Sequence, residues 1–424
     1  MASPTDIAPM PRTQKVMWTF FGATCLQLAF LQPYIVLVPG ERANLFSGLL
    51  CFVTLLVIWI LGKEGLKLKS PEVLISLALV VLGTLSGLCS LTPRSSSIRV
   101  FILLASALGG FWGARILLTS DRHRRLFQWL CLLILASILL LSFTGFILSG
   151  RITHFFDPNY HSPTDIIFLL SFAPLAFLFE GSRPQVLGGI LLLGLSYLIL
   201  CLSGSLSVVL ITQALFLAIA LAGRLRFRYF LIIILMMALI PMGRGKDRPA
   251  VVYLAQHVLG QKAIREHVSV YYRIENIYLS WEIAKKHPLL GIGLRTSREK
   301  FLENYQLRYP YVTKEKFAQN VATVVSSDNM FLTILAGLGF PFMIIYCACL
   351  LILFGRLIKL AWGPSRPGSF PPVVLLLPLT ASLLHFQFFD GLLFPQLSSF
   401  FHILLGLIPT VSGKEAHQTA DLGG

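Results

Sequence analysis

The sequence predicts an all-α integral membrane protein with about twelve transmembrane helices and one large loop on the outer side of the membrane. Of its 424 residues, 55% are hydrophobic and only 13% are charged, whereas a soluble domain carries about 25% charged residues. The mean hydropathy is +0.76. This composition excludes a soluble enzyme, a disordered chain and a secreted disulfide-stabilised scaffold.

Apolar runs close to the length of about 20 residues that a spanning helix needs recur along the chain. They lie at residues 17–38, 45–62, 72–92, 98–118, 126–149, 165–180, 186–202, 205–222, 229–243, 330–355, 371–389 and 396–411. The polar first sixteen residues show no cleavable signal pattern, so we expect the first run to stay as an anchor. All seven cysteines fall within apolar runs, so neither a disulfide framework nor a zinc cluster is expected.

The charges of the short loops predict how the chain crosses the membrane. If the N-terminus is cytoplasmic, the cytoplasmic segments hold sixteen Lys and Arg residues and the short outer loops hold four, which are Arg42, Arg94, Arg99 and Arg151. Short cytoplasmic loops carry an excess of Lys and Arg. We therefore expect both termini in the cytoplasm.

Residues 244–328 break the pattern of short connections. They form an outer loop of about 85 residues with 14 Lys and Arg against 8 Asp and Glu. Long loops cross the membrane largely regardless of their charge, and loops of this length are usually functional. The chain then divides into helices one to nine (1–243), the large loop (244–328), helices ten to twelve (329–411) and a cytoplasmic tail (412–424).

Within the large loop, the periodicity predicts a helix from Val270 to His287, which Pro288 and Gly291 end. A polar flank of this helix carries Arg273, Asn276 and Ser280 one turn apart. This polar flank could bind substrate, or the helix could simply lie on the bundle with the flank exposed to solvent. Its predicted apolar stripe, at three-four spacing, consists of Val270, Ile274, Ile277, Trp281 and Ala284.

Two further segments of the loop suggest chemistry. Two glycines before a predicted helix that starts at Thr296, with Arg295 and Arg298 beside it, suggest an anion site made of backbone N–H groups and guanidinium groups. At the end of the loop, Asp328 precedes Asn329 and the tenth apolar run. An Asp at this boundary fits a general base or the cap of the following helix.

These segments resemble the bacterial O-antigen ligase and O-antigen or exopolysaccharide polymerase superfamily. Members often carry "R…W…HPLLGVG…F" in their large periplasmic loop, and the run from Tyr272 to Phe301 is similar to it. Three more segments follow the family's order, and together they cover about residues 140–411. They are Gly150 to Tyr160, Asp328 to Gly339 and Phe389 to Leu407.

The resemblance implies a membrane glycosyltransferase with a GT-C-like fold in the bacterial inner membrane, with its large loop in the periplasm. Such enzymes move a glycan from a polyprenyl-diphosphate donor to a hydroxyl of a glycan or glycolipid acceptor. They need no cofactor, nucleotide sugar or metal. Membrane lipid and polysaccharide-assembly proteins are the other expected partners, and nucleic acid is not one.

The resemblance also implies roles for particular residues. Asp328 stands where ligases have a catalytic His, and Arg273 is the best-matched arginine for the diphosphate, because fixed guanidinium groups stabilise the charge that grows on a leaving phosphate. The following lists complete the candidates. Diphosphate binding is expected of Arg151, Arg273, Arg295 and Arg298. Substrate binding is expected of Asn329, Asp157, Asn159, Asn276 and His287, although Asp157 and Asn159 also suit a turn and His287 also suits a helix cap.

Two departures from the family pattern bear on the activity. Asp328 replaces the His of ligases, and Ser203-Gly-Ser205-Leu206 replaces the usual Ser-Arg. Because an Asp at this position suits polymerases better, the sequence favours a polymerase over a ligase. A small-anion transporter with the basic loop as an electrostatic funnel and a non-catalytic assembly scaffold remain as alternatives.

Overall fold

The computed structural model is a bundle of helices, and no strand occurs among the residues it describes. These residues are 10–31, 40–62, 70–149, 162–202, 268–294, 296, 329–362, 372–387 and 391–411. The first half contains α1 (Arg12–Leu26), which continues as the π-helix η1 (Gln27–Leu31), α3 (Gly40–Leu61), α4 (Pro71–Leu88), α5 (Pro93–Leu117), α6 (Asp121–Ser149), α7 (Ser162–Leu170), α8 (Phe172–Glu180) and α9 (Arg183–Leu202). The second half contains α14 (Val268–Lys286), α17 (Met330–Trp362), α18 (Val373–His385), the 3-10 helix η5 (Gly391–Leu393) and α19 (Pro395–Val411).

Six of the described helices are long and apolar enough to cross a membrane, namely α3, α4, α5, α6, α9 and α17. The all-α membrane character predicted from the sequence is therefore confirmed for this part of the chain. The predicted runs 205–222 and 229–243 lie outside the described residues, so the count of twelve spans stays a prediction.

The core of the bundle forms around α5, which packs against α3, α4 and α19. Glycines bring the backbones of α5 and α19 into contact at two points. A Cβ at Gly110 would lie 2.5 Å from the carbonyl oxygen of Ser399, and a Cβ at Gly406 would overlap with that of Phe111. Small residues at crossings are typical of membrane bundles, where close backbone approach supplies the van der Waals attraction between helices.

The apolar run predicted at 165–180 is not one continuous helix. It divides into α7 and α8 at Ser171, whose hydroxyl donates to the carbonyl of Phe168 at 2.6 Å. The cause is Pro174, which has no N–H to donate to the carbonyl of Leu170 four residues earlier.

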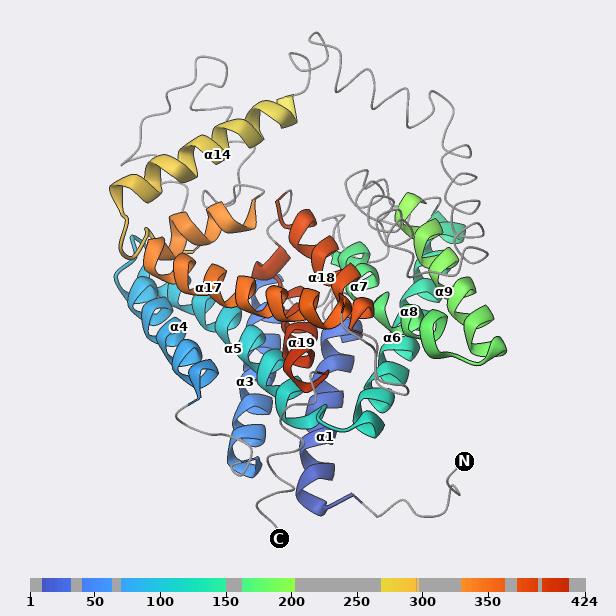
Figure 1. Cartoon of the computed structure of the whole chain (residues 1–424). Coiled ribbons are helices and arrows are strands. Elements are labelled where there is room, and N and C mark those ends of the chain that lie inside the picture. Colours follow the sequence, from blue (N-terminus) through green and yellow to red (C-terminus); the bar gives the residue numbers. More distant parts are fainter. Residues whose placement is uncertain are drawn as a thin grey trace.

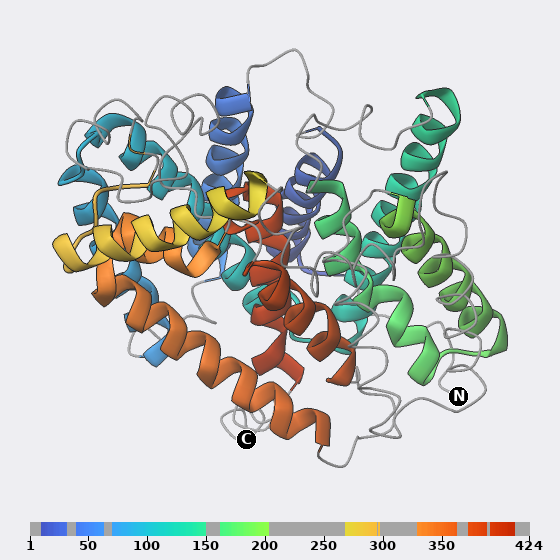
Figure 2. The same ribbon diagram turned by 90° about the horizontal axis from the view of Figure 1, so that it is seen from above.

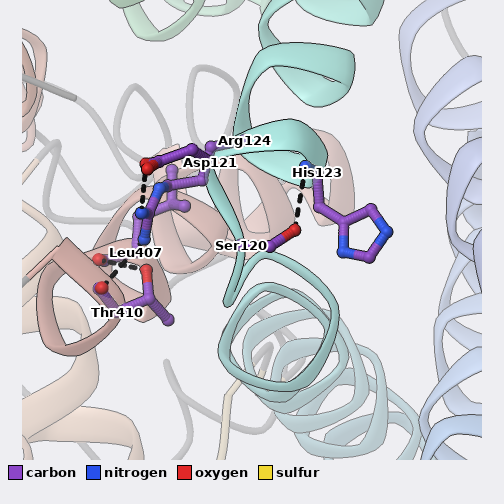
Figure 3. A network of polar contacts seen from close by, with 6 residues as sticks. All are labelled: Ser120, Asp121, His123, Arg124, Leu407 and Thr410. Carbon is purple, nitrogen blue, oxygen red and sulfur yellow. Dashed lines mark hydrogen bonds and ion pairs between the residues drawn. The ribbon is translucent and has the colours of Figure 1, made fainter. Parts of the chain in front are cut away.

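Arg124, one of the charges counted above as cytoplasmic, is buried and joins two helices. Its guanidinium donates to the carboxylate of Asp121 at 2.5 Å and to the carbonyl of Thr410 at 2.8 Å. Figure 3 shows this side chain between the start of α6 and the end of α19, with His123 turned the other way. A cation at the C-terminus of α19 also stabilises that helix through its dipole.

The helix α14 lies across one end of the bundle. Figure 1 shows it at the upper end, whereas α1 begins at the lower end. In the view from above, α14 runs over the first part of α17, with which it is in contact (Figure 2). The large-loop helix and the start of the chain's first helix thus lie at opposite ends of the bundle, as the predicted topology requires, while the sidedness in the membrane stays a prediction.

Candidate active site

The helix α14 forms where the sequence predicts it, but a different face of it is buried. The predicted stripe contained Ile277 and Trp281, which are 41% and 43% exposed. Leu279 and Ile283 are buried instead, and the predicted polar flank residue Asn276 is only 8% exposed. Of the predicted stripe, Ala284 is buried as expected, whereas Ile277 and Trp281 lie on the exposed side, so the prediction is only partly correct.

The physical reason lies in two apolar stripes that overlap along α14. Leu279 and Ile283 have the same four-residue spacing as Ile277 and Trp281, so periodicity alone does not choose between them. Ser280 and Ala284, both at most 3% exposed, flank Leu279 and Ile283 and allow close packing. Trp281 lies at the edge of the contact, with its ring centroid 6.2 Å from that of Phe340.

The segment that follows α14 pairs with α17 through backbone hydrogen bonds. The N–H of Ile292 donates to the carbonyl of Ala336 at 3.0 Å, and the N–H of Gly293 donates to that of Gly337 at 2.9 Å. In the opposite direction, the N–H of Phe340 donates to the carbonyl of Pro288 at 2.8 Å. We call residues 287–294 together with 336–340 the clasp.

The clasp forms because α17 is broken at this point. Pro341 has no N–H for the carbonyl of Gly337, and Gly339 has φ 83° and ψ 172°, which takes it out of the helix. The carbonyls of Ala336 and Gly337 therefore lose their helical donors and become acceptors for the loop. Since buried backbone groups must be paired, the break in α17 and the loop after α14 require each other.

The corner between α4 and α5 completes the clasp. The Ser86 hydroxyl lies 2.6 Å from the carbonyl oxygen of Leu290 and 2.9 Å from that of Gly337, and these two acceptors share its single hydrogen. The N–H of Leu91 donates to the carbonyl of Ile292 at 3.1 Å. Three separate parts of the sequence thereby fix where α14 lies.

These bonds change the expectation of an anion site built on Gly291 and Gly293. The N–H of Gly291 donates to the carbonyl of His287 at 3.1 Å, and those of Ile292 and Gly293 donate to α17. All three N–H groups are used within the protein and are not available to a phosphate. An anion at this loop is therefore not bound by these three N–H groups, and the N–H groups of the helix predicted to start at Thr296 lie outside the described residues apart from Thr296 itself.

The start of α17 is tied to the end of α18. Asn329 accepts a hydrogen bond from the N–H of Leu332 at 3.1 Å, so it caps α17, and its amide donates to the Gln387 side chain at 3.1 Å. The N–H of Met330 donates to the carbonyl of Phe386 at 2.8 Å. Asn329 thus caps α17, while the two roles predicted for Asp328, cap or general base, stay predictions because Asp328 lies outside the described residues.

The structure places some of the predicted site residues at one end of the bundle. Arg273 lies in α14 three residues before Asn276, His287 is exposed at the first position of the clasp, and Asn329 begins α17. The other candidates, Arg151, Asp157, Asn159, Arg295, Arg298 and Asp328, lie outside the described residues.

Ser86 and Gln387 are two residues that the sequence analysis missed. Ser86 sits beside Gly83 and Gly87 near the end of an apolar run, and this small-residue pattern marks a close helix contact in membranes. Gln387 is a polar residue near the end of an apolar run. Both signals are present in the sequence, but neither names the partner.

Comparison with known families identifies this same region. Residues 189–347 match the family described as O-antigen ligase, a range that includes α14, the clasp and the first half of α17. The resemblance to the O-antigen ligase and polymerase superfamily is confirmed. No curated protein matches the chain.

The O-antigen ligase match and the apolar helices together give a coarse assignment. The protein is a membrane protein of polysaccharide biosynthesis, and the family that residues 189–347 match indicates an enzyme of the ligase or polymerase type that uses lipid-linked glycan and acceptor substrates.

Proposed function

We propose that the protein transfers a glycan from a polyprenyl-diphosphate donor to a sugar hydroxyl at the periplasmic face of the bacterial inner membrane. A polymerase of O-antigen or exopolysaccharide is the favoured activity, because Asp328 stands in place of the ligase His. An O-antigen ligase, acting on a lipid or another acceptor, is the alternative. Both termini are then cytoplasmic.

The observation that carries the proposal is the buried polar face of α14. The carbonyl oxygen of the Asn276 side chain is buried and accepts no hydrogen bond from any residue that the structure describes. A buried acceptor without a donor costs about 1–3 kcal/mol, and a sugar hydroxyl would satisfy it. Arg273 is three residues away, about 4.5 Å along the axis of the same helix, which suits a ligand that joins a sugar to a phosphate.

The proposed reaction is a displacement at the anomeric carbon of the donor. Asp328 takes the proton of the acceptor hydroxyl while the oxygen of that hydroxyl forms the new glycosidic bond with the anomeric carbon. The bond between the anomeric carbon and the phosphate oxygen breaks, and the polyprenyl diphosphate leaves with the electron pair. Arg273, with Arg151, Arg295 and Arg298, stabilises the charge on this leaving group.

Within this proposal Asn329 and His287 act at the edges of the site. Asn329 caps the first turn of α17 and follows Asp328 directly in the sequence, so the proposed base is next to a fixed helix start. His287 follows α14 and faces solvent at the clasp. The acceptor chain, together with Asp157 and Asn159, is expected on that side.

A test of the activity is to delete the gene and size the surface glycans on a gel, with the wild-type gene restored as control. Single repeat units in place of a long ladder would support a polymerase. Complete chains that stay on the polyprenyl carrier would support a ligase. An unchanged glycan profile contradicts both and returns the small-anion transporter to consideration.

The substitution Asn276→Leu tests the role of the buried acceptor. Since Leu has the same number and branching of heavy atoms as Asn and removes an unsatisfied polar atom, we expect the protein to keep its thermal stability or gain up to about 1 kcal/mol. Glycan transfer should fall by about tenfold or more, because a hydrogen bond to substrate is lost. The two quantities are measured by thermal unfolding in detergent and by ladder length in cells.

The matched control is Ser280→Ala, one turn further along the same buried face. It should leave transfer close to the wild-type level. A destabilised Asn276→Leu protein with normal transfer per molecule would assign Asn276 to packing alone.

A further inference from the structure

A second site lies between α4, α5, α17 and α19, away from α14. It is a cavity of about 150 Å³ whose wall is mainly apolar, with Ile75, Leu79, Leu103, Phe342, Leu350 and Leu353 among the lining residues. Its polar lining groups include Glu72 and Arg356, and Tyr346 and His402.

The charged part of this cavity is far from the clasp. Arg356 follows Phe340 by sixteen residues along α17, which corresponds to about 24 Å of helix. Glu72 precedes Ser86 by fourteen residues along α4, or about 21 Å. The distance is close to the thickness of a bilayer core, about 30 Å, so the two sites belong to opposite membrane surfaces.

The two helices beside the cavity face lipid. On α17, Leu351 is 74% and Ile344 is 62% exposed, and on α4, Leu74 and Leu77 are 57% and 58% exposed. Both helices are candidate membrane spans, and side chains of this kind meet hydrocarbon in a membrane. An apolar cavity beside them is filled most favourably by a lipid chain.

The Tyr346 hydroxyl and the His402 ring do not need a polar ligand to satisfy their hydrogen bonds. The Nδ1 atom of His402 lies 2.7 Å from the carbonyl oxygen of Ser398 and so carries the hydrogen. Its Nε2 atom then accepts from the hydroxyl of Tyr346 at 3.3 Å. The two rings satisfy each other, and an alkyl chain can lie against them.

Arg356 differs from this pair because its guanidinium has more N–H donors than the Glu72 carboxylate can accept from. Its guanidinium carries five N–H donors, its side chain is 53% exposed, and its Nη1 atom lies 3.7 Å from the Glu72 carboxylate. Lys359 and Trp362 are exposed beyond it on α17, and such residues mark the level of lipid headgroups. A phosphate at this level would meet a cation that a single carboxylate only partly neutralises.

We propose that this cavity holds the first part of one acyl chain of an anionic phospholipid whose headgroup phosphate is bound by Arg356. The lipid belongs to the membrane leaflet opposite the proposed glycan transfer. Glu72 competes with the phosphate for the guanidinium, so it weakens binding while keeping Arg356 at the mouth. Basic residues between transmembrane helices are a known physical basis of anionic lipid recognition.

The test is native mass spectrometry of the purified full chain with phosphatidylglycerol and phosphatidylcholine of identical acyl chains. The wild type is expected to retain phosphatidylglycerol preferentially. Arg356→Gln should lower that preference by about tenfold or more, because it removes a charge-assisted hydrogen bond to the phosphate, and Glu72→Gln should raise it. The control Lys359→Gln removes an exposed cation of the same helix outside the cavity, so it should lower the preference less, by at most about fivefold, the contribution of one cation near the headgroups.

A variant of the cavity wall tests the acyl chain separately. Ala107 lines the cavity, and Ala107→Phe should reduce retention of both lipids equally. Should that variant fail to fold, the opposite effects of Arg356→Gln and Glu72→Gln still decide. The proposal is overturned if the wild type retains both lipids equally, or if Arg356→Gln and Lys359→Gln have equal effects. It is also overturned if the protein is a dimer that Ala107→Phe dissociates, because a second copy of the chain would then occupy the cavity.

Discussion

Replacing Gly339 with alanine is expected to destroy the clasp and with it the folded arrangement of α14 on α17. The position has φ 83° and ψ 172°, a region that is essentially restricted to glycine and costs other residues about 1–3 kcal/mol. A Cβ there would also overlap with the carbonyl oxygen of Leu289. We expect a loss of several kcal/mol in stability, seen as a lower melting temperature in detergent and less protein in the membrane.

The matched control for this substitution is Gly355→Ala on the same helix. A Cβ at Gly355 meets nothing within 4 Å, and alanine favours a helix over glycine by about 1 kcal/mol. This variant should be as stable as the wild type or slightly more so. Equal stability of Gly339→Ala and Gly355→Ala would mean that the pairing of α17 with the loop contributes little to the fold.

The clasp illustrates what a sequence of this kind predicts and what it does not. The bounds of α14 are predicted within two residues, since Val270 to His287 was expected and Val268–Lys286 is found. Pro288 and Gly291 correctly mark its end, because proline cannot continue a helix and Gly291 has φ 64°. These are local properties, which residue type and spacing determine.

The hydrogen-bond partners of Gly293 and Gly337 are not local, and the sequence does not predict them. Nothing in either segment states that the carbonyl of Gly337, freed by Pro341, will meet the N–H of Gly293. The glycines were therefore interpreted as an anion site, since glycines before a helix fit that role equally well. Only the packing of α4, α14 and α17 decides between a free and an occupied N–H.

The candidate site shows a similar division. That Asn276 and Ser280 share one flank of α14 follows from helical periodicity, whereas the burial of that flank does not. It depends on which of two overlapping apolar stripes packs better against α17. The predicted role of Asp328 rests on its resemblance to a family position, and the described cap at Asn329 is consistent with Asp328 being left for chemistry.

The largest functional effects are expected from Arg273 and Asp328. If Arg273 stabilises the leaving diphosphate, Arg273→Ala should lower the turnover of glycan transfer by about 100- to 1,000-fold, as does the loss of one preorganised donor in other enzymes. Arg273→Lys keeps the charge but loses the planar fork of donors that matches a phosphate, so it should restore only part of the rate.

Asp328→Asn should lower turnover by about 100- to 10,000-fold, the usual contribution of a general base.

Lys285→Gln is the control for Arg273→Ala, because it removes one positive charge from the same helix. Lys285 is exposed and pairs with Glu282 at 2.6 Å. Each variant removes one positive charge, so the salt-screened electrostatic potential near the helix should change by a similar amount in both. Transfer assays with purified protein and a lipid-linked donor separate kcat from KM. A fall in kcat for Arg273→Ala but not for Lys285→Gln assigns Arg273 to the transition state, since uniform binding of the donor would alter KM alone. If the two variants behave alike, the arginine contributes only to the basic character of the loop, and the leaving group must be stabilised from another part of the chain.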